Sequence, residues 1–227
     1  MTMSDQSTAS TSVRGVLFDM DGVLISSTGS DERAWGKWAA FHGMQGTFSV
    51  QSTHGRRAAD SLRALRPDLD PLVEAQRLEA FDAESSEGIA ILPGVRRLLA
   101  KLRPSQWGVV TSASDALMRR RLESVGIAVP PTIVTADKVQ RGKPDAEPYQ
   151  LGAMQLGLTS AECLVIEDAP NGIRAGKLAG CKVLAVIGSH RAIELREADW
   201  IVASLDHVDV SNSEDGWLNL QFETVSI

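Results

Sequence analysis

Two aspartates, Asp19 and Asp21, follow directly on the short apolar run of residues 16–18. Such a run is typical of a buried strand, so Asp19 would lie at its carboxyl end and Asp21 would return to the same side. Gly22 would allow the chain to leave the strand sharply. Two carboxylates at this spacing repel each other unless a cation or a shared proton lies between them. The pattern therefore indicates a cation-dependent carboxylate site, although a strand followed by an Asx-type turn would give the same residues.

Polar residues of related kinds follow three further apolar runs. Thr111 and Ser112 stand before an expected helix, where hydroxyl and N–H groups form a cradle for an anion or simply cap the helix. Lys143 precedes another expected helix, and its ammonium group could reach the same place or be solvated. Glu167 and Asp168 repeat the paired carboxylates of the first run, which an acidic turn would also produce. Each stretch alone leaves both interpretations open.

The runs that end in these residues belong to a regular alternation of strand-like and helical segments. Strand-like composition recurs at residues 107–110, 132–135, 164–166, 182–187 and 200–202, and helices are expected near 95–102, 115–124, 146–156 and 172–179. Alternation of this kind predicts right-handed crossovers and an α/β fold with a doubly wound parallel sheet. In such sheets ligands bind beyond the carboxyl ends of the strands, which is where all the polar stretches would meet.

A block without strand patterning separates the first strand from this alternation. Ser30 would cap a helix that ends near Gly43, and further helices are expected over residues 57–66 and 71–85. We therefore predict that residues 27–92 form a small, inserted, all-helical domain.

The remaining residues would form one α/β core domain, composed of residues 13–26 and 93–227. Residues 1–12 are rich in serine and threonine and lack the apolar segment of a secretory signal. We expect them to form a disordered tail.

Composition limits the cellular setting and the partners. The 227-residue chain has a formal net charge of −6 and 43% hydrophobic residues, which suits a globular protein and argues against a general nucleic-acid binder. No apolar run is long enough to cross a membrane. Cys163 and Cys181 lie in apolar surroundings without metal-site spacing, which is typical of buried reduced thiols. We expect a monomeric cytoplasmic protein that binds a small molecule, and neither nucleic acid nor a membrane.

Taken in order, the polar stretches resemble the motifs of the haloacid dehalogenase superfamily of phosphotransferases. The resemblance spans the core domain and is carried by Asp-x-Asp-Gly at residues 19–22, Gly-Lys-Pro at 142–144 and Glu-Asp at 167–168. The helical block resembles the family's helical cap, of the type found in β-phosphoglucomutase and small phosphatases. Residues 140–149 and 167–176 resemble the glycerol-phosphatase and 2-deoxyglucose-6-phosphatase branch, a group of sugar phosphatases.

The resemblance implies a Rossmann-like core and a role for each motif residue. Asp19 would be the nucleophile that forms an aspartyl-phosphate, and Asp21 would protonate the leaving alcohol and then activate water. Thr111 or Ser112 would hydrogen-bond the phosphoryl oxygens, because the motif needs one hydroxyl at this strand end. Lys143 would bind the transferring group and neutralise charge on it and on the nucleophile.

The resemblance also implies a bound Mg²⁺. Asp168 and Glu167 would be ligands, and Asp19 with the backbone carbonyl of Asp21 would complete the set. A hard cation suits these oxygen donors, which need no histidine or cysteine beside them. The cation would balance the repulsion between the paired carboxylates.

Substrate choice would lie with the cap, because the core touches only the phosphoryl group. His54, Arg56 and Arg57 form its most polar cluster and are expected to contact a sugar or polyol, although a solvated basic helix start would look the same. We therefore predict a Mg²⁺-dependent phosphatase of small sugar or polyol phosphates. Two alternatives stay open. One is a β-phosphoglucomutase-like phosphomutase, although Asp31 stands where the mutase has a histidine. The other is a non-catalytic protein that binds a phosphorylated metabolite.

Overall fold

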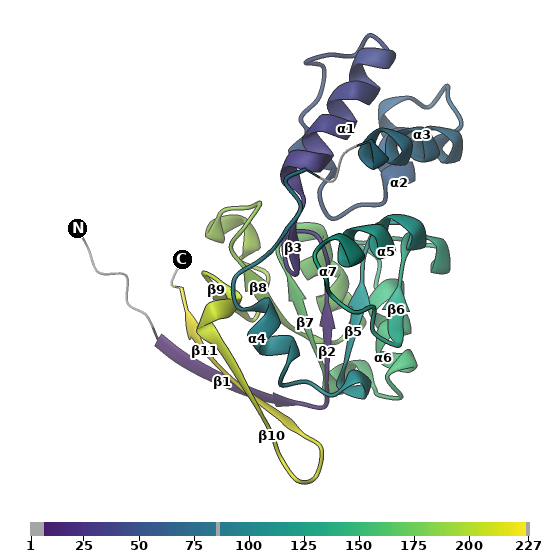
Figure 1. Ribbon diagram of the computed structural model, residues 1–227. Coiled ribbons are helices and arrows are strands. Elements are labelled where there is room, and N and C mark those ends of the chain that lie inside the picture. The colour runs from purple at the N-terminus through teal and green to yellow at the C-terminus, as the bar shows by residue number, and fades with distance from the viewer. Residues whose placement is uncertain (1–6, 85–86, 226–227) are drawn as a thin grey trace, which may run out of the picture.

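Six parallel strands form the central sheet in the computed structural model, which describes residues 7–84 and 87–225 (Figure 1). The strand order is β6-β5-β2-β7-β8-β9. The chain starts in the middle at β2, builds outward to β5 and β6, and then crosses to β7, β8 and β9. This arrangement confirms the predicted α/β fold with a doubly wound parallel sheet. The strand bounds are β2 Gly15–Phe18, β5 Trp107–Val110, β6 Thr132–Val134, β7 Cys163–Glu167, β8 Lys182–Val186 and β9 Trp200–Val202.

Helices cover both faces of this sheet, so its central strands are buried throughout. On the face of Phe18, α4 (Val95–Leu99) and α5 (Asp115–Ser124) contribute to one apolar cluster. On the face of Leu17, α6 (Glu147–Gln155) and α7 (Pro170–Ala179) contribute to another. Among the described helices, none combines the length and the apolar composition needed to span a bilayer.

A helical cap interrupts the chain between β2 and β5. Its helices α1 (Thr28–Phe41), α2 (Ala58–Leu65) and α3 (Pro71–Ala83) lie above the carboxyl edge of the sheet in Figure 1. The chain enters the cap through β3 (Ile25–Ser26) and leaves it through β4 (Ala90–Ile91), and these two segments pair as antiparallel strands. The cap has an apolar cluster of its own, centred on Trp35, Trp38, Leu62 and Leu78.

Ser30 does not cap the first cap helix, contrary to the expectation from sequence. Helix α1 begins at Thr28, two residues before Ser30, and Ser27 flanks it. The hydroxyl of Ser30 instead donates a hydrogen bond of 2.7 Å to Asp82 Oδ1 on α3. The expectation failed because this buried carboxylate, 52 residues further along the chain, is a partner that the local sequence does not reveal.

A second, antiparallel sheet joins the two ends of the chain, in the order β1-β11-β10. It consists of β1 (Ser7–Val13), β10 (Val208–Asn212) and β11 (Leu218–Thr224). The predicted disordered tail is therefore wrong for residues 7–12, which pair with β11 along their whole length. Composition gave no sign of this strand because its partner lies at the opposite end of the chain. Residues 1–6 of the predicted tail lie outside the described residues.

Deleting residues 1–12 should destabilise the protein, because β11 would lose the strand that hydrogen-bonds along its length. We expect the melting temperature to fall by about 5 °C or more in circular dichroism measurements. Deletion of residues 1–6, which leaves the strand intact, is the matched control. An unchanged melting temperature in the longer deletion would contradict the pairing of β1 with β11.

Candidate active site

The motif residues meet at the carboxyl edge of the sheet, below the cap. Asp19 follows β2, Thr111 follows β5 and Asp168 follows β7, and these three strands are neighbours in the sheet. A cavity of about 480 Å³ opens above them and is lined by both core and cap residues. Its lining includes Asp19, Asp21, Thr111, Ser112 and Asp168 from the core, and His54, Arg56 and Arg57 from the cap.

Lys143 lies behind Asp19 and is almost completely buried. Its ammonium Nζ donates to Asp19 Oδ1 at 2.5 Å, to Glu167 Oε1 at 2.7 Å and to the carbonyl oxygen of Val110 at 2.9 Å. Burial alone would lower the pKa of Lys143, but Asp19 and Glu167 raise it above its ordinary value. The ammonium group is therefore a fixed positive charge directly against Asp19.

Glu167 anchors this lysine, and both oxygens of its carboxylate accept hydrogen bonds. Its Oε1 accepts from Lys143 and from the hydroxyl of Tyr149, each at 2.7 Å. Its Oε2 accepts from the backbone N–H groups of Asp168 and Ala169, at 3.1 and 3.3 Å. A Cβ atom at Gly172 would lie 1.7 Å from Oε1, so the following helix can approach this carboxylate only with glycine at that position. These contacts favour an anchoring role for Glu167.

Three buried carboxylates, of Asp19, Glu167 and Asp168, place oxygen atoms within 4.8 Å of one another. Burial raises the pKa of Asp19 well above its ordinary value, even though Lys143 opposes the shift. Burial and the neighbouring Glu167 raise the pKa of Asp168 to about 7. One lysine therefore leaves negative charge uncompensated. A donor set made only of oxygens suits a hard divalent cation such as Mg²⁺.

Gly22 allows the loop after β2 to pass close to this cluster. Its φ angle of +81° lies in the region that glycine adopts most readily, and an added Cβ would lie 2.0 Å from Asp168 Oδ2. That same oxygen also accepts a hydrogen bond from the hydroxyl of Ser189. The Asp-x-Asp-Gly motif thus needs its glycine for both conformation and space.

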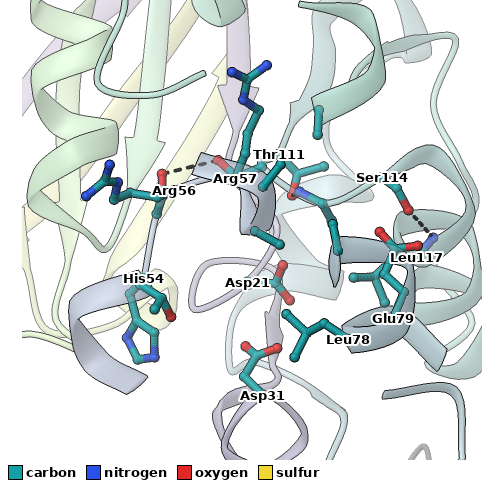
Figure 2. Close-up of a pocket in the computed structure, with 18 of the residues that line it drawn as sticks. Asp21, Asp31, His54, Arg56, Arg57, Leu78, Glu79, Thr111, Ser114 and Leu117 are labelled. Atoms are coloured by element: carbon teal, nitrogen blue, oxygen red, sulfur yellow. Dashed lines mark hydrogen bonds between the residues drawn. The ribbon is translucent and has the colours of Figure 1, made fainter. Parts of the chain in front are cut away.

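Asp21 makes a contact that the sequence did not indicate. Its Oδ1 accepts a hydrogen bond of 2.6 Å from Arg121 Nη1 on α5. Arg121 also reaches Asp31 and Asp82, which belong to the cap helices α1 and α3. Figure 2 shows the carboxylates of Asp21 and Asp31 near each other inside the cavity.

The two candidate phosphate-binding hydroxyls have different surroundings. Thr111 is buried, and its Oγ1 accepts from the backbone N–H of Ala113 at 3.1 Å. Ser112 Oγ donates to the carbonyl oxygen of Gly55 in the cap loop at 3.1 Å. Ser114 Oγ caps α5 by accepting from the N–H of Leu117. Thr111 and Ser112 both line the cavity, so each stays a candidate.

The three cap residues predicted to contact substrate all line the cavity, but other residues hold their side chains to different extents. Arg57 binds both carboxylate oxygens of Asp60, at 2.7 and 3.1 Å, and donates to the carbonyl oxygen of Val139 in the core at 3.1 Å. Arg56 is exposed. Burial, and then His190, lower the pKa of His54, whose Nδ1 finds no hydrogen-bond partner among the described residues. In Figure 2 the guanidinium groups of Arg56 and Arg57 extend away from Asp21.

Sequence reasoning missed several residues that shape this site. Arg121 stands in a run of three arginines, and nothing in that run distinguishes it. Tyr149 is a single buried aromatic in a helix, and Ser189 lies in the loop after β8, a strand whose end carries none of the motifs. Glu79 of α3 also lines the cavity, and burial raises its pKa. Helical spacing in the sequence could have assigned Glu79 to one face of α3, but not to the cavity.

Comparison with known proteins shows which family the chain resembles. Residues 13–180 match the family of haloacid dehalogenase-like hydrolases. The chain is 40% identical over 213 residues to hexitol phosphatase A of Escherichia coli, covering 92% of this chain and 99% of that protein. It is 31% identical over 226 residues to 2-deoxyglucose-6-phosphate phosphatase 2 of Saccharomyces cerevisiae, covering 88% and 92% of the two chains.

A solved structure has the same fold. A hydrolase from Pseudomonas syringae superposes with a TM-score of 0.74 at 24% identity, covering 85% of this chain and 94% of that chain. The family resemblance is confirmed by the family match and the sequence relatives, and the expected fold by this structure.

Replacing Asp31 with asparagine should change how stability depends on pH. Burial raises the pKa of Asp31 to about 6, although Arg121 opposes the shift, while an unfolded aspartate has its ordinary value of 3.8. A carboxyl with a raised folded pKa stabilises the folded state at low pH and loses this contribution as pH rises through about 6. Relative to the parent, the free energy of unfolding of Asp31→Asn should therefore rise by about 1 kcal/mol between pH 5 and pH 8.

Denaturant unfolding in metal-free buffer measures this difference. Glu32→Gln, which changes the exposed neighbouring carboxylate on the same helix, is the control. A difference between Asp31→Asn and the parent that does not vary with pH would show that Asp31 has an ordinary pKa in the folded protein.

Proposed function

This chain belongs to the family of haloacid dehalogenase-like hydrolases, and from that premise we propose that it is a Mg²⁺-dependent phosphatase of a small sugar or polyol phosphate. The observation that supports this most strongly is the buried contact of Lys143 with Asp19 at the floor of the cavity, with Asp21 beside it. A protein that only bound a phosphorylated metabolite would need no nucleophile held against a fixed cation. The names of the hexitol and 2-deoxyglucose-6-phosphate phosphatases support the substrate class.

In the first step we assign Asp19 as the nucleophile. Lys143 holds its Oδ1, so Oδ2 forms the bond to phosphorus while the bond from phosphorus to the alcohol oxygen breaks. Asp21 gives its proton to that alcohol oxygen. Thr111 or Ser112 and Lys143 stabilise the charge on the transferring phosphoryl group. The products of this step are the free alcohol and an aspartyl-phosphate at Asp19.

In the second step Asp21 acts as a base. It takes a proton from a water molecule whose oxygen forms a bond to phosphorus, and the bond between phosphorus and Asp19 breaks. Inorganic phosphate leaves, and both carboxyl groups return to their starting states. Arg121 holds Asp21 Oδ1 during this cycle, and Oδ2 is the oxygen that we assign to proton transfer.

Asp19 and Asp168, with the backbone carbonyl of Asp21, are the groups that would hold Mg²⁺. When bound, the ion supplies positive charge against the phosphoryl oxygens and the clustered carboxylates. The raised pKa values of Asp19 and Asp168 support the fit, because burial first and the neighbouring carboxylates second disfavour the charged forms, which a bound divalent cation would stabilise. The contacts of Glu167 favour its role as the anchor of Lys143 over direct ligation.

The rest of the substrate would lie between the core and the cap. A volume of about 480 Å³ is within the usual range for small-molecule sites. We propose that His54, Arg56 and Arg57 contact or enclose the sugar or polyol. Asp31 is paired with Arg121, which favours hydrolysis over the phosphomutase alternative. The cytoplasmic location and the monomeric state stay predictions from the sequence.

Activity should require Mg²⁺ and be lost on chelation, because the carboxylates that would hold the ion otherwise repel one another. Steady-state hydrolysis of p-nitrophenyl phosphate, titrated with MgCl₂, measures this dependence. Asp168→Asn should raise the Mg²⁺ concentration for half-maximal activity by about tenfold or more. Asp145→Asn, at a carboxylate outside the buried cluster, is the control. Full activity in metal-free buffer would contradict the proposed cofactor.

Asp21→Asn should separate the two chemical steps. The amide has nearly the size of the carboxyl group but neither donates the required proton nor accepts one from water. With an aryl phosphate, whose leaving group needs little protonation, Asp19 should still be phosphorylated while hydrolysis of the phosphoenzyme slows by about a hundredfold. The phosphorylated protein should then accumulate.

Rapid quench followed by intact-mass measurement detects that species as a mass increase on the peptide that contains Asp19. Asp19→Asn, which removes the nucleophile, is the matched control and should show no mass increase. If Asp21→Asn hydrolyses sugar phosphates at the parent's rate, Asp21 is not the acid–base group.

A further inference from the structure

Arg121 of α5 makes the most extensive buried ionic contact near the cavity. Its side chain is 2% exposed, although it carries a full charge. Nη1 donates to Asp21 Oδ1 at 2.6 Å, while Nη2 donates to Asp31 Oδ1 at 2.6 Å and to Asp82 Oδ1 at 2.8 Å. A buried arginine is stable only with such partners, because desolvation of an isolated charge costs several kcal/mol or more.

The three carboxylates come from three different parts of the fold. Asp21 belongs to the core loop after β2, Asp31 to the first cap helix α1, and Asp82 to the last cap helix α3. The polypeptide enters and leaves the cap next to α1 and α3, through the β3–β4 pair. Arg121 itself belongs to the core. One side chain therefore connects the assigned acid–base residue with both helices by which the cap is attached.

Secondary contacts hold the cap end of this network in place. Ser30 of α1 donates to Asp82 Oδ1, so the two cap helices are also joined directly. Arg120, the preceding residue of α5, pairs with the other oxygen of Asp82. Arg120 thus shares Asp82 with Arg121 but, among the described residues, forms no ion pair with Asp21.

The guanidinium group transmits position because it is rigid and planar. Nη1 and Nη2 belong to one delocalised plane, so neither can move without turning the other. When Asp31 and Asp82 are docked, Nη2 is fixed between them and Nη1 is thereby fixed against Asp21. Movement of the cap away from the core would withdraw both acceptors of Nη2 and leave the plane free to rotate.

We propose that Arg121 is a positioning residue that makes the orientation of Asp21 depend on docking of the cap. This inference rests on the proposed phosphatase function. In it, the contacts of Arg121 with Asp21, Asp31 and Asp82 determine when Asp21 delivers its proton. Asp21 would present its free oxygen to the leaving alcohol only when the cap covers the substrate. Protonation of the alcohol would then coincide with exclusion of bulk water from the cavity.

The test compares substrates whose leaving groups differ in their need for a proton. Single-turnover phosphorylation of Asp19 is measured by rapid quench with Mg²⁺, using p-nitrophenyl phosphate as the aryl substrate. The alkyl substrate is whichever of sorbitol 6-phosphate, 2-deoxyglucose 6-phosphate and glycerol 1-phosphate the parent hydrolyses fastest. Arg121→Lys keeps the positive charge but replaces the planar fork by a single ammonium group. Its phosphorylation rate with the alkyl substrate should fall by about tenfold more than with the aryl substrate.

Two further variants separate this role from simple stability. Arg120→Lys changes the adjacent arginine, which contacts Asp82 but not Asp21, and should keep the parent's ratio of alkyl to aryl rates. Asp82→Asn alters only the cap end of the network and should lower that ratio in the same direction as Arg121→Lys. Melting temperatures of all variants are also measured. A loss of folded protein would lower the rates with both substrates equally and would leave their ratio unchanged.

The outcomes distinguish the inference from the function on which it rests. If Arg121→Lys loses activity equally with both substrates, or not at all, Arg121 does not position Asp21. If Asp82→Asn keeps the parent's ratio, the dependence on cap docking is wrong. A parent protein that hydrolyses none of the four phosphates would overturn the proposed phosphatase function, and the inference with it.

Discussion

Negative charge buried at the carboxyl edge of the parallel sheet is the constraint on which the rest of this structure depends. Asp19, Glu167 and Asp168 bring their oxygens within 4.8 Å of one another, in a place where water screens them little. Lys143 places one positive charge against these carboxylates, and its contacts with Glu167 and the Val110 carbonyl fix it in one position. The pKa of Asp19 nevertheless stays raised by its burial. A divalent cation bound here would stabilise the charged carboxylates, and the proposed Mg²⁺ dependence rests on this argument.

A second buried cation, Arg121, divides the carboxylates of the cavity into two groups. Lys143 carries a compact charge, which suits three oxygens arranged closely around one point. Arg121 carries a planar fork, which suits carboxylates that arrive from separate elements. Asp19 and Asp21, the proposed nucleophile and acid–base group, are only two residues apart in sequence but are held by different cations. If the proposed roles hold, this separation would allow Asp19 to contact the metal while the orientation of Asp21 depends on the cap.

The sequence predicted the residues at the strand ends because parallel strands bring such residues to one edge whatever the details of packing. Asp19, Thr111 and Asp168 could be placed together from the alternation of strands and helices alone. Contacts between residues that lie far apart in the sequence could not be predicted in this way. The contact between Arg121 and Asp21 spans 100 residues, and β1 pairs with a strand at the other end of the chain. Neither leaves a local pattern, since an arginine in a helix or a Ser/Thr-rich segment is normally solvated.

Several polar contacts join the cap to the core, and the apolar cluster of the cap is separate from the two clusters of the sheet. Backbone carbonyls supply several of these contacts: Arg57 donates to Val139, Ser112 to Gly55, and Gln51 to Ser189. Such hydrogen bonds contribute little net free energy, because water replaces them when they break. An apolar interface of the same size would resist opening, since its exposure to water is unfavourable in proportion to its area. If the cap opens to admit the proposed substrate, exchangeable hydrogen bonds would permit that movement, and the buried contacts of Arg121 would define the docked position.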